Sequence, residues 1–567
     1  MQLVDIFLKY LLGEGVQQVF GIPGGLLHPF FDAIEKDKNF DLLVAKHEGG
    51  AAFMADGFAR AGGGLPVVAA TSGPGATNLI TGVACAFADG VPMLVITGQA
   101  SSHSLGKGAA QETTAEDIDI VGMFRPITKY SAFVAQPERL THHLRRAMRH
   151  VHSGRPGPVH LNVPVDFWRK EIDEEWFNPL SYKSSPALFD RDRVQEAASM
   201  LMNASNPVLL VGSGAGSDNA RKHILSLAEG LGAYVATTPR AKGIFPEDHR
   251  LSLGVFGFAG HRRAKKYILE GNVDVVFTIG TSLGETATFN WDQRLTENRK
   301  LMHLDIDIDR IGRNYPVDVS LVGDAGTVLY EILHHTKQQW ERSVKVPGEQ
   351  YLDHGIVEER YDFPNLRASM DVPLKPQRWR YELSDVLPEN AIIFSDIGGH
   401  MLFNVHHLLM KSEQDFYLNL GFGSMGHGTV APIGAKLACP RRAVIAIIGD
   451  ACLTMNGMEL LCAVENDIPV VWIVEDNQMH GITYHGSKLV SGSPMKSIVL
   501  KKPLDLHAMA EAMGLFTQSV SKPGEIAQAL SHALESRKAS MIIVKVDPNV
   551  SPPLGDRAKA VEGFKNE

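Results

Sequence analysis

Asp450 and Asn477 each follow a short apolar segment, and their types and spacing could hold a divalent cation. The segments are 443–448 and 469–474, so the two polar residues stand 27 positions apart at equivalent ends. Apolar runs of this length, with a helical stretch at 455–466 between them, are typical of a buried parallel sheet. Ligands of such sheets bind outside the carboxyl ends of the strands. A carboxylate and an amide oxygen there suit a hard cation that keeps a diphosphate oxygen in its shell.

These two residues also have an ordinary interpretation. Aspartate is common at the first residues of helices, and asparagine is common in turns, where each bonds to nearby backbone. The strand–helix–strand pattern alone does not decide between a cation site and a pair of capping residues. Other segments of the chain are needed to decide.

Those segments resemble motifs of the thiamine-diphosphate enzymes. Residues 449–451 and 476–477 resemble the GDG…NN motif of that family, with the spacing of its acetolactate (acetohydroxyacid) synthase branch. Residues 421–435 resemble that branch's GLGTMGFGLPAAIGA segment. Further matching segments occur in family order at 20–25, 47–52, 71–78, 111–112, 126–129, 154–158, 305–309 and 322–324. Because the ordered set spans nearly the whole chain, the protein is identified as a member of this family by resemblance.

The alternation of apolar strands and helices indicates an α/β protein built from three blocks. The resemblance implies three doubly wound parallel-sheet domains of the thiamine-diphosphate enzyme fold. We expect a pyrimidine-binding domain at 1–170, a central domain at 190–340 and a diphosphate- and magnesium-binding domain at 375–547. The tail, 548–567, is rich in proline, glycine and charge, so we expect it to order only against the active site or not at all.

The composition fits a multi-domain enzyme. The 567 residues are 44% hydrophobic with a formal net charge of −9, which argues against a nucleic-acid-binding surface. No stretch approaches 18 uninterrupted apolar residues, so we expect no membrane span, and residues 1–12 are predicted to be a first helix rather than a targeting segment. The four cysteines show no CxxC pairing, which favours reduced core residues in a cytoplasmic protein.

Glu48 is the strongest candidate for a catalytic residue. Thiamine diphosphate acts only after its C2 carbon loses a proton to the amino group of its own ring. The resemblance gives Glu48 the role of making that group basic, through a contact with the pyrimidine nitrogen. Without the resemblance, Glu48 would be read as an acidic residue in the first turn of a helix, favoured by the helix dipole.

Other residues of the first block are assigned by the same resemblance. Gly24 and Gln111 join Glu48 in the catalytic set, while Gly25, Thr71 and Asn78 are expected to bind the cofactor. A glycine pair allows the backbone to approach a ligand closely. The glycines of 71–78 would also suit a plain strand-to-helix turn, so that segment is weak evidence by itself.

The third block is expected to hold the diphosphate and a magnesium ion. The resemblance implies three magnesium ligands: the side chains of Asp450 and Asn477 and the carbonyl of Met479. Met425 matches the bulky residue that props the cofactor into a bent conformation, although a methionine is otherwise read as core filler. The expected cofactor-binding residues here are Gly398, His400, Gly423, Met425, Gly449, Asp450, Ala451, Cys452, Asn477, Gly481 and Ile482.

Several residues depart from the synthase pattern. Ala451 replaces the second glycine of GDG. Ala110 stands where the synthases carry phenylalanine and Gly486 where they carry tryptophan, which predicts a wider acceptor pocket than one built for pyruvate and 2-oxobutyrate. Ser282 and Thr286 stand where they carry arginines. Flavin-free relatives share the 305–309 and 322–324 segments, so the resemblance allows FAD without requiring it.

Histidines occur at three further positions of the third block. His480 is included in the catalytic set, and His427 and His485 lie in the neighbouring motifs. Each could act as an acid–base group or bind an acceptor carboxylate. Each could equally be a packed or solvent-facing residue.

We therefore predict a thiamine-diphosphate- and magnesium-dependent carboligase. It would decarboxylate a 2-oxo acid such as pyruvate and add the enamine to a second carbonyl acceptor. A simple 2-oxo acid decarboxylase is the alternative in the same class, and a non-catalytic regulatory paralogue is the alternative outside it. In this family the two cofactor-binding blocks come from different subunits. The resemblance thus implies a homodimer at minimum, with a homotetramer as the larger option.

Overall fold

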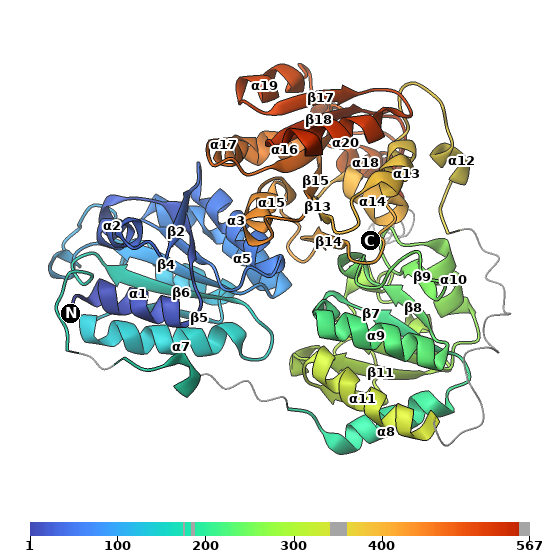
Figure 1. The fold of residues 1–567 in the computed structure, drawn as a ribbon, viewed down its shortest axis with the longest axis horizontal. Coiled ribbons are helices and arrows are strands. Elements are labelled where there is room, and N and C mark those ends of the chain that lie inside the picture. Colours follow the sequence, from blue (N-terminus) through green and yellow to red (C-terminus); the bar gives the residue numbers. More distant parts are fainter. Residues whose placement is uncertain (174–175, 183–187, 341–359, 555–567) are drawn as a thin grey trace.

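The computed structural model of the protein describes residues 1–173, 176–182, 188–340 and 360–554. Three six-stranded sheets follow one another along the chain, and helices surround each of them (Figure 1). All strand pairs within the three sheets are parallel. The predicted fold class is confirmed, whereas the domain boundaries stay a prediction.

The first sheet has the strand order β2-β1-β3-β4-β6-β5. Its strands β3, β4 and β6 are buried along their whole length, as continuous apolar runs in a parallel sheet should be. The strands are β1 (Gln18–Ile22), β2 (Asp41–Val44), β3 (Val67–Ala70), β4 (Met93–Gln99), β5 (Tyr130–Phe133) and β6 (Pro158–Pro164). The helices are α1 (Leu3–Gly13), α2 (His28–Lys36), α3 (Glu48–Arg60), α4 (Pro74–Asn78), α5 (Ile80–Asp89), α6 (Ile120–Phe124) and α7 (Leu140–His152).

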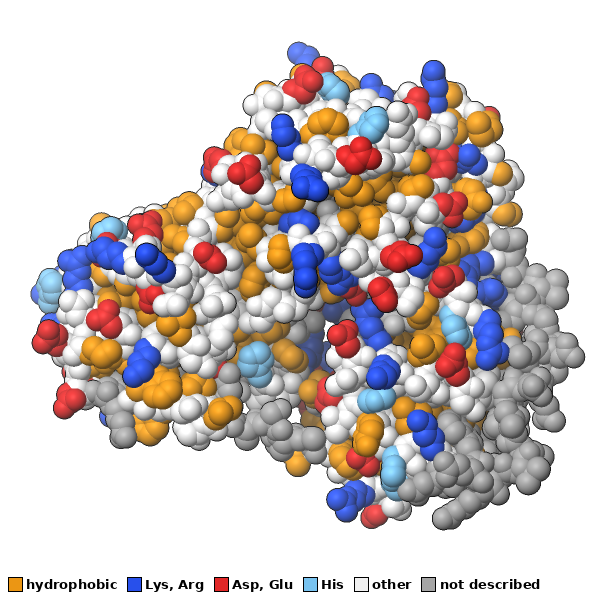
Figure 2. Space-filling model, viewed as in Figure 1, with side chains coloured by type: hydrophobic (Ala, Val, Ile, Leu, Met, Phe, Trp, Pro, Cys, Tyr) orange, Lys and Arg blue, Asp and Glu red, His pale blue; other side chains and the backbone are white. Residues whose placement is uncertain are grey.

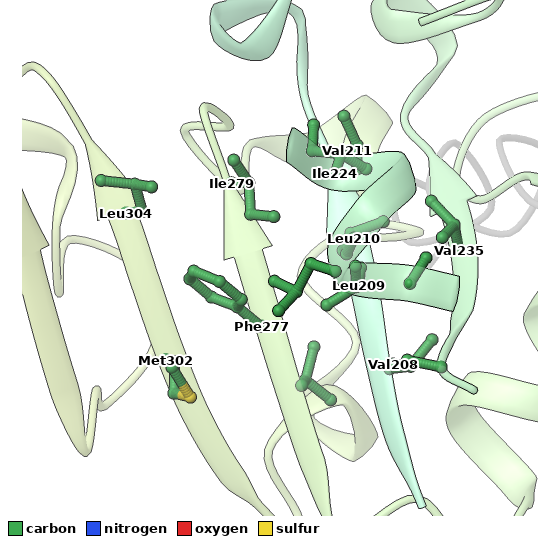
Figure 3. Close-up of a cluster of buried hydrophobic side chains, with 14 of the residues drawn as sticks. Val208, Leu209, Leu210, Val211, Ile224, Val235, Phe277, Ile279, Met302 and Leu304 are labelled. Carbon is green, nitrogen blue, oxygen red and sulfur yellow. The ribbon is translucent and has the colours of Figure 1, made fainter. Parts of the chain in front are cut away.

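The second sheet has the order β12-β11-β10-β7-β8-β9. Figure 3 shows its core, where side chains of neighbouring strands such as Leu209 and Phe277 lie close together and Ile224 comes from the covering helix. The strands are β7 (Pro207–Val211), β8 (Tyr234–Thr237), β9 (Ser252–Val255), β10 (Val275–Ile279), β11 (Lys300–Asp305) and β12 (Val319–Val322). The helices are α8 (Arg191–Asn203), α9 (Asp218–Leu231), α10 (Arg262–Glu270) and α11 (Ala325–Trp340).

The third sheet has the order β14-β13-β15-β16-β18-β17. The predicted strands at 443–448 and 469–474 are confirmed as β15 and β16. The strands are β13 (Ile392–Ser395), β14 (Asp415–Leu418), β15 (Val444–Gly449), β16 (Val470–Asp476), β17 (Phe516–Val520) and β18 (Ser540–Lys545). The helices are α12 (Pro364–Arg367), α13 (Pro376–Val386), α14 (Gly399–His407), α15 (His427–Ala438), α16 (Asp450–Asn456), α17 (Leu460–Glu465), α18 (Gly481–Ser491), α19 (Leu506–Ala512) and α20 (Glu525–Ser536).

The helix predicted at 455–466 differs from the structure. Helix α16 already begins at Asp450 and ends at Asn456, and a 3-10 turn (Gly457–Glu459) separates it from α17. The interruption places the Asn456 side chain against Gly426, where an added Cβ would lie 2.1 Å from Asn456 Oδ1. It also turns the Glu459 side chain toward the first domain.

Helices α3 and α15 pack the first domain against the third (Figure 1). The contact is close enough to require glycine on both helices. A Cβ on Gly57 would lie 1.9 Å from the carbonyl oxygen of Ala431, and a Cβ on Gly434 would lie 1.8 Å from that of Met54. Backbone-to-backbone contact of this kind places the two domains in a defined orientation.

Each sheet has one switch point, where the strand order reverses its direction along the sheet. Ligands of such sheets bind at the switch point, outside the carboxyl ends of the strands. The reversal falls between β1 and β3, between β7 and β10, and between β13 and β15. The predicted site residues of the first and third domains follow these strands (β1, β3, β13 and β15) or the strands beside them (β2, β4, β14 and β16). Among the described residues no helix is both long and apolar enough to span a bilayer.

Candidate active site

The loop after β3 brings the predicted residues of the first domain together. A Cβ on Gly24 would lie 2.5 Å from Thr71 Cβ, so the loops after β1 and β3 touch. Further along the loop, a Cβ on Gly75 would lie 2.9 Å from Thr71 Cγ2 and 3.4 Å from Glu48 Oε1. Gly25 faces open space, since a Cβ there would meet nothing within 4 Å.

Glu48 is the first residue of α3 and is half-buried. Its Oε2 accepts a hydrogen bond of 2.9 Å from Asn78 Nδ2, so two of the predicted residues are in direct contact. His47 caps the same helix, because its Nδ1 accepts a bond of 3.0 Å from the backbone N–H of Gly49. The Glu48 carboxylate is therefore oriented by its neighbours at the N-terminus of a helix, where negative charge is favoured.

Gln111 lies beside the same loop. A Cβ on Gly73 would lie 3.4 Å from Gln111 Cβ, and Ser72 Oγ donates a hydrogen bond of 2.7 Å to the Gln111 carbonyl. Gln111 has a φ of 59°, in the left-handed region that residues other than glycine rarely occupy. All six predicted residues of the first domain thus meet around one switch point.

The predicted residues of the third domain also meet around its switch point. His400 lies between the ends of β13 and β15, because a Cβ on Gly398 would lie 2.7 Å from its Cε1 and a Cβ on Gly449 would lie 2.9 Å from its Nδ1. Cys452 Sγ lies 3.1 Å from the Ile397 carbonyl. Burial lowers the pKa of His400 to about 3, and its buried Nε2 has no hydrogen-bond partner among the described residues.

Asp450 and Asn477 lie on neighbouring strand ends, as predicted. Asp450 Oδ2 accepts a hydrogen bond of 2.6 Å from the backbone N–H of Gln478, and Asn477 Oδ1 accepts one of 3.1 Å from that of Met479. Asp450 Oδ1 accepts a further bond of 2.7 Å from the Ala451 N–H. Burial raises the pKa of Asp450 to about 7, and backbone donation only partly opposes this. A buried carboxyl of this kind gains from a cation beside it.

The start of α18 completes this edge. A Cβ on Gly481 would lie 2.9 Å from Asn477 Nδ2, and a Cβ on Gly399 would lie 3.3 Å from the backbone nitrogen of Ile482. In the part of the chain that the structure describes, no cluster of three His, Cys, Asp or Glu side chains could hold a metal ion. The predicted ligand set contains one carboxylate, one amide and one carbonyl, so it does not depend on such a cluster.

Met425 lies half-buried in the turn before α15, between Gly423 and Gly426, which both have positive φ. Asp396 fastens this turn. Its carboxylate accepts bonds of 3.0 and 3.1 Å from the Gly426 N–H and bonds of 3.0 and 2.9 Å from the N–H and hydroxyl of Thr429. Sequence reasoning missed Asp396, although an aspartate directly after a buried strand was a usable signal.

Arg380 and Glu459 are two further residues that the sequence did not indicate. Arg380 is fully buried and donates to Glu475 Oε2 at 2.7 Å and to the His400 carbonyl at 3.2 Å, so it connects two parts of the third-domain site. Glu459 Oε1 accepts a bond of 2.7 Å from the His47 N–H. No local motif marks either residue, because their partners lie far away in the chain.

The three histidines have different surroundings. His427 is buried with its Nε2 2.6 Å from Asp56 Oδ1, and it contacts Phe53 edge to face, so it packs the two domains together. His485 Nε2 lies 3.1 Å from the carbonyl of Pro548, which connects α18 to the beginning of the tail. His480 is half-buried at the N-terminus of α18, next to the predicted magnesium ligands.

The tail contributes to this contact, since residues 548–554 are described and Leu554 is buried in the core of the third domain. Residues 555–567 lie outside the described residues. A Cβ on Gly486 would meet nothing within 4 Å, and the wider acceptor pocket stays a prediction. Ala110 is exposed beside Gln111.

The two groups of predicted residues are separate within one chain. Each group is internally connected by the contacts above. In the described residues, no hydrogen bond joins Glu48, Thr71, Asn78 or Gln111 to the third-domain group. The chain therefore presents two half-sites, one at each switch point.

A cavity of about 750 Å³ lies at the switch point of the second sheet, between the ends of β7 and β10, and residues of all three domains line it. Figure 2 shows Lys and Arg side chains gathered near a hollow between the three lobes. Its lining includes Ser282, the Gly212–Gly214 turn and the arginines Arg60, Arg155, Arg221, Arg240, Arg310 and Arg442. Burial and neighbouring arginines lower the pKa of Arg155, which indicates crowded positive charge.

Comparison with known proteins decides the family. Family models for the N-terminal, central and C-terminal domains of thiamine pyrophosphate enzymes match residues 1–122, 194–332 and 396–544. The chain belongs to the thiamine pyrophosphate enzymes. The predicted family and the prediction of a thiamine-diphosphate-dependent enzyme are therefore confirmed.

Relatives place the chain near one branch of this family. The probable acetolactate synthase large subunit of Methanocaldococcus jannaschii is 34% identical over 98% of this chain and 93% of its own length. The acetolactate synthase isozyme 3 large subunit of Escherichia coli K12 is 30% identical over 95% of this chain and 93% of its own. This thiamine pyrophosphate enzyme is thus similar to acetolactate synthase large subunits.

A solved structure supports the fold. The thiamine diphosphate-dependent 4-hydroxybenzoylformate decarboxylase of Rhodococcus jostii RHA1 superposes with a TM-score of 0.84 at 23% identity, covering 96% of this chain and 99% of that one. At this identity the likeness establishes the architecture alone.

The half-sites of this enzyme fit its cofactor. Buried His400 Nε2 and buried Thr71 Oγ1 both have no partner among the described residues, one in each half-site. Buried polar atoms without partners are rare in native proteins, so each is available to a ligand. The glycines at 398, 399 and 449 lie around His400 in one half-site, and the half-buried Glu48 carboxylate lies in the other.

Proposed function

We propose that this protein is a thiamine-diphosphate- and magnesium-dependent carboligase. It decarboxylates a 2-oxo acid such as pyruvate and joins the remaining unit to a second carbonyl acceptor. The observation that carries the proposal is the pair of half-sites, with Glu48 bonded to Asn78 in one and Asp450 beside Asn477 in the other. Bound thiamine diphosphate would supply a carbanion at C2 and store electrons while CO₂ leaves.

Each half-site has a task in this proposal. Glu48, oriented by the hydrogen bond from Asn78, would hold a proton shared with the pyrimidine nitrogen. Gly24 and Gly25 would let the backbone approach the ring closely, and Met425 would contact it from the third-domain half-site. His480, half-buried at the N-terminus of α18 beside the proposed magnesium ligands, would exchange a proton with the substrate.

Magnesium is proposed because the expected metal ligands are all oxygen atoms. Asp450 and Asn477 side-chain oxygens and the Met479 carbonyl are hard oxygen ligands, and magnesium takes its remaining ligands from water and phosphate. Ionised Asp450 is needed to bind the cation. A bound cation would stabilise that ionised form against the burial that raises its pKa to about 7.

The acceptor is proposed to be larger than pyruvate or 2-oxobutyrate. The space at Gly486 and the small side chain of Ala110 leave room where the synthases carry aromatic residues. This proposal sets the protein apart from a synthase dedicated to branched-chain precursors. A simple 2-oxo acid decarboxylase is the second candidate, but the paired histidines typical of such enzymes do not follow Gly98 and Gln99.

A homodimer is proposed because one cofactor must contact both half-sites, and these are separate within the chain. Two-fold pairing of identical chains would build two complete sites, and a homotetramer could add a second copy of that dimer. We also propose a cytoplasmic location, supported by the free thiols of Cys85, Cys439, Cys452 and Cys462.

FAD is proposed as the occupant of the central cavity. A volume of about 750 Å³ lined by glycine turns and arginines suits a phosphate-bearing dinucleotide. Among the lining arginines, Arg60 and Arg240 pair with Asp89, Arg221 and Arg442 pair with Asp415, and Arg310 pairs with Asp307. Arg155 donates to the Ala88 carbonyl at 2.6 Å and has no carboxylate partner among the described residues, so it is the arginine that we assign to a phosphate. Heat-denatured protein should release flavin, seen by absorbance and fluorescence of the supernatant, and a flavin-free supernatant would contradict this assignment.

A product screen tests the main proposal. Purified protein with thiamine diphosphate and magnesium is offered pyruvate against a panel of aldehydes and 2-oxo acids, and products are detected by mass spectrometry. We expect a carbon–carbon coupled product whose formation stops when either cofactor is left out. Release of CO₂ with only the free aldehyde as product would favour the decarboxylase, and no turnover with bound cofactor would favour the non-catalytic paralogue.

A further inference from the structure

A buried chain of side-chain hydrogen bonds ends on the backbone of Gln111. Ser72 and Gln99 are fully buried and Thr113 is 2% exposed. Ser72 Oγ donates to the Gln111 carbonyl at 2.7 Å and lies 2.8 Å from Thr113 Oγ1. Gln99 Nε2 donates to Thr113 Oγ1 at 3.0 Å, and the Thr113 N–H donates to Gln99 Oε1 at 3.1 Å. The loop that carries Gln111 is therefore connected to the end of β4.

The donor in each of these hydrogen bonds can be assigned from the number of protons that each group carries. Each hydroxyl has one proton to donate. The Ser72 proton is used on Gln111, so the Thr113 hydroxyl must donate to Ser72 and accept from Gln99. Each of the two hydroxyls donates onward once, and consecutive bonds of this kind strengthen one another in a low-dielectric interior. Removal of one member would leave buried partners unpaired, which is costly.

A second series of hydrogen bonds connects Gln99 to neighbouring strands of the first sheet. Gln99 Nε2 also donates to Asn162 Oδ1 at 3.1 Å, and Asn162 Nδ2 donates to Thr97 Oγ1 at 2.9 Å. The Thr97 hydroxyl then donates to His160 Nε2 at 2.8 Å, and His160 Nδ1 donates to Ser131 Oγ at 2.9 Å. His160 is thus neutral, in agreement with the burial that lowers its pKa to about 3.

Gln111, whose carbonyl accepts the hydrogen bond from Ser72, has a strained backbone conformation. Gln111 has a φ of 59°, and such a backbone persists only where its surroundings enforce it. The Glu112 carboxylate also fixes this loop, because it accepts hydrogen bonds from the N–H groups of Gly106 at 2.5 Å and Ala109 at 3.1 Å. The Gln111 side chain itself is exposed, with its Cβ beside Gly73.

We propose that Ser72 and Thr113 are positioning residues that hold Gln111 so that its amide faces the donor 2-oxo acid. The amide carries two N–H donors, which suit the donor's carboxylate. This inference rests on the proposed function, because a 2-oxo acid donor is part of that proposal and Gln111 belongs to its expected catalytic set. It adds that recognition of the donor depends on a hydroxyl pair that contacts neither cofactor nor substrate.

The first test is Thr113→Val, which keeps the shape of the side chain and removes the hydroxyl. We expect the donor KM to rise about tenfold, as loss of a buried hydrogen bond that positions a substrate contact should cause. The Kd of thiamine diphosphate should stay within about twofold of the wild type. The matched control is Thr278→Val, since Thr278 is equally buried and its hydroxyl donates to the Met302 carbonyl at 2.9 Å in the central sheet. The control should change neither constant.

The second test separates positioning from general damage. In a Gln111→Ala background, Thr113→Val should raise the donor KM no further, because the contact that it positions is already gone. If Thr113→Val raised the donor KM by the same factor in the Gln111→Ala background as in the wild type, the proposal would be overturned.

The third test needs no turnover. Amide hydrogen exchange across 101–113 should be faster in Thr113→Val than in Thr278→Val, and equal exchange would overturn the proposal. If the loop loosens as expected but wild-type protein turns over no 2-oxo acid, the proposed function has failed and the positioning of Gln111 has not.

Discussion

Glu459 Oε1 accepts a hydrogen bond of 2.7 Å from the backbone N–H of His47, the residue immediately before Glu48. The same carboxylate accepts a bond of 3.1 Å from the Lys46 N–H through Oε2. A side chain of the third domain thus holds the backbone that carries the proposed activator in the first domain. Gly50 makes room for it, since a Cβ there would lie 2.3 Å from the carboxylate carbon of Glu459.

Glu459→Ala should therefore weaken the docking of the two domains. We expect a loss of about 1–3 kcal/mol in the free energy of unfolding, because two backbone N–H groups lose their acceptor. Denaturant unfolding followed by circular dichroism measures it. Glu465→Ala is the matched control, since Glu465 bonds to the exposed Lys46 side chain, and a loss as large as that of Glu459→Ala would contradict the account.

Asp450→Ala should abolish binding of thiamine diphosphate. The diphosphate would then face the site without its counter-cation, and the remaining amide and carbonyl ligands carry no charge. Titration calorimetry with magnesium present gives the affinity. Asp318→Ala, which removes a carboxylate paired with Lys300 in the central domain, should bind normally. Normal affinity in the Asp450 variant would remove the proposed metal site.

Glu48→Gln should retain the cofactor but slow the loss of its C2 proton. Removal of a positioned acid–base partner typically costs about 10²–10⁴-fold. Hydrogen–deuterium exchange at C2 of the bound cofactor is the direct readout. Glu35→Gln on the surface of α2 serves as the control, and an exchange rate for Glu48→Gln equal to that of this control would mean that Glu48 does not activate the ring.

Ala110→Phe should reduce the use of large acceptors more than small ones. The added ring would occupy space that the proposed acceptor needs, and discrimination is measured by the ratio of kcat/KM values for the two acceptors. Competition between a bulky and a small aldehyde in one reaction gives this ratio directly. Equal losses for both would place Ala110 outside the acceptor path.

Much of the site could be predicted because its motifs are local. Gly449 to Cys452 and Asn477 to Ile482 each combine a strand end with the start of a helix, and both features are visible in a short stretch of sequence. The switch points of the three sheets then bring such stretches together without any further information from the sequence.

Other contacts could not be predicted because they depend on residues far apart in the chain. Glu459 lies 412 positions from His47, and Asp56 lies 371 from His427. The sequence allows His427 to be either an acid–base group or a packed residue, and in the structure it packs against Asp56. Burial raises the pKa of Asp56. The charges of Arg60 and His427 lower it more strongly, so the pKa is held below its usual range. Only the packing of α3 on α15 makes this pairing visible.

We propose that each cofactor is held by Glu48 from one chain and Asp450 from another. Inactive Glu48→Gln protein is mixed with inactive Asp450→Ala protein under conditions that exchange subunits, and carboligase activity is measured. A mixed dimer would contain one doubly altered site and one intact site, so up to about half of its sites should become active. No recovery, despite exchange demonstrated by mass spectrometry of the mixed dimer, would contradict a site shared between chains.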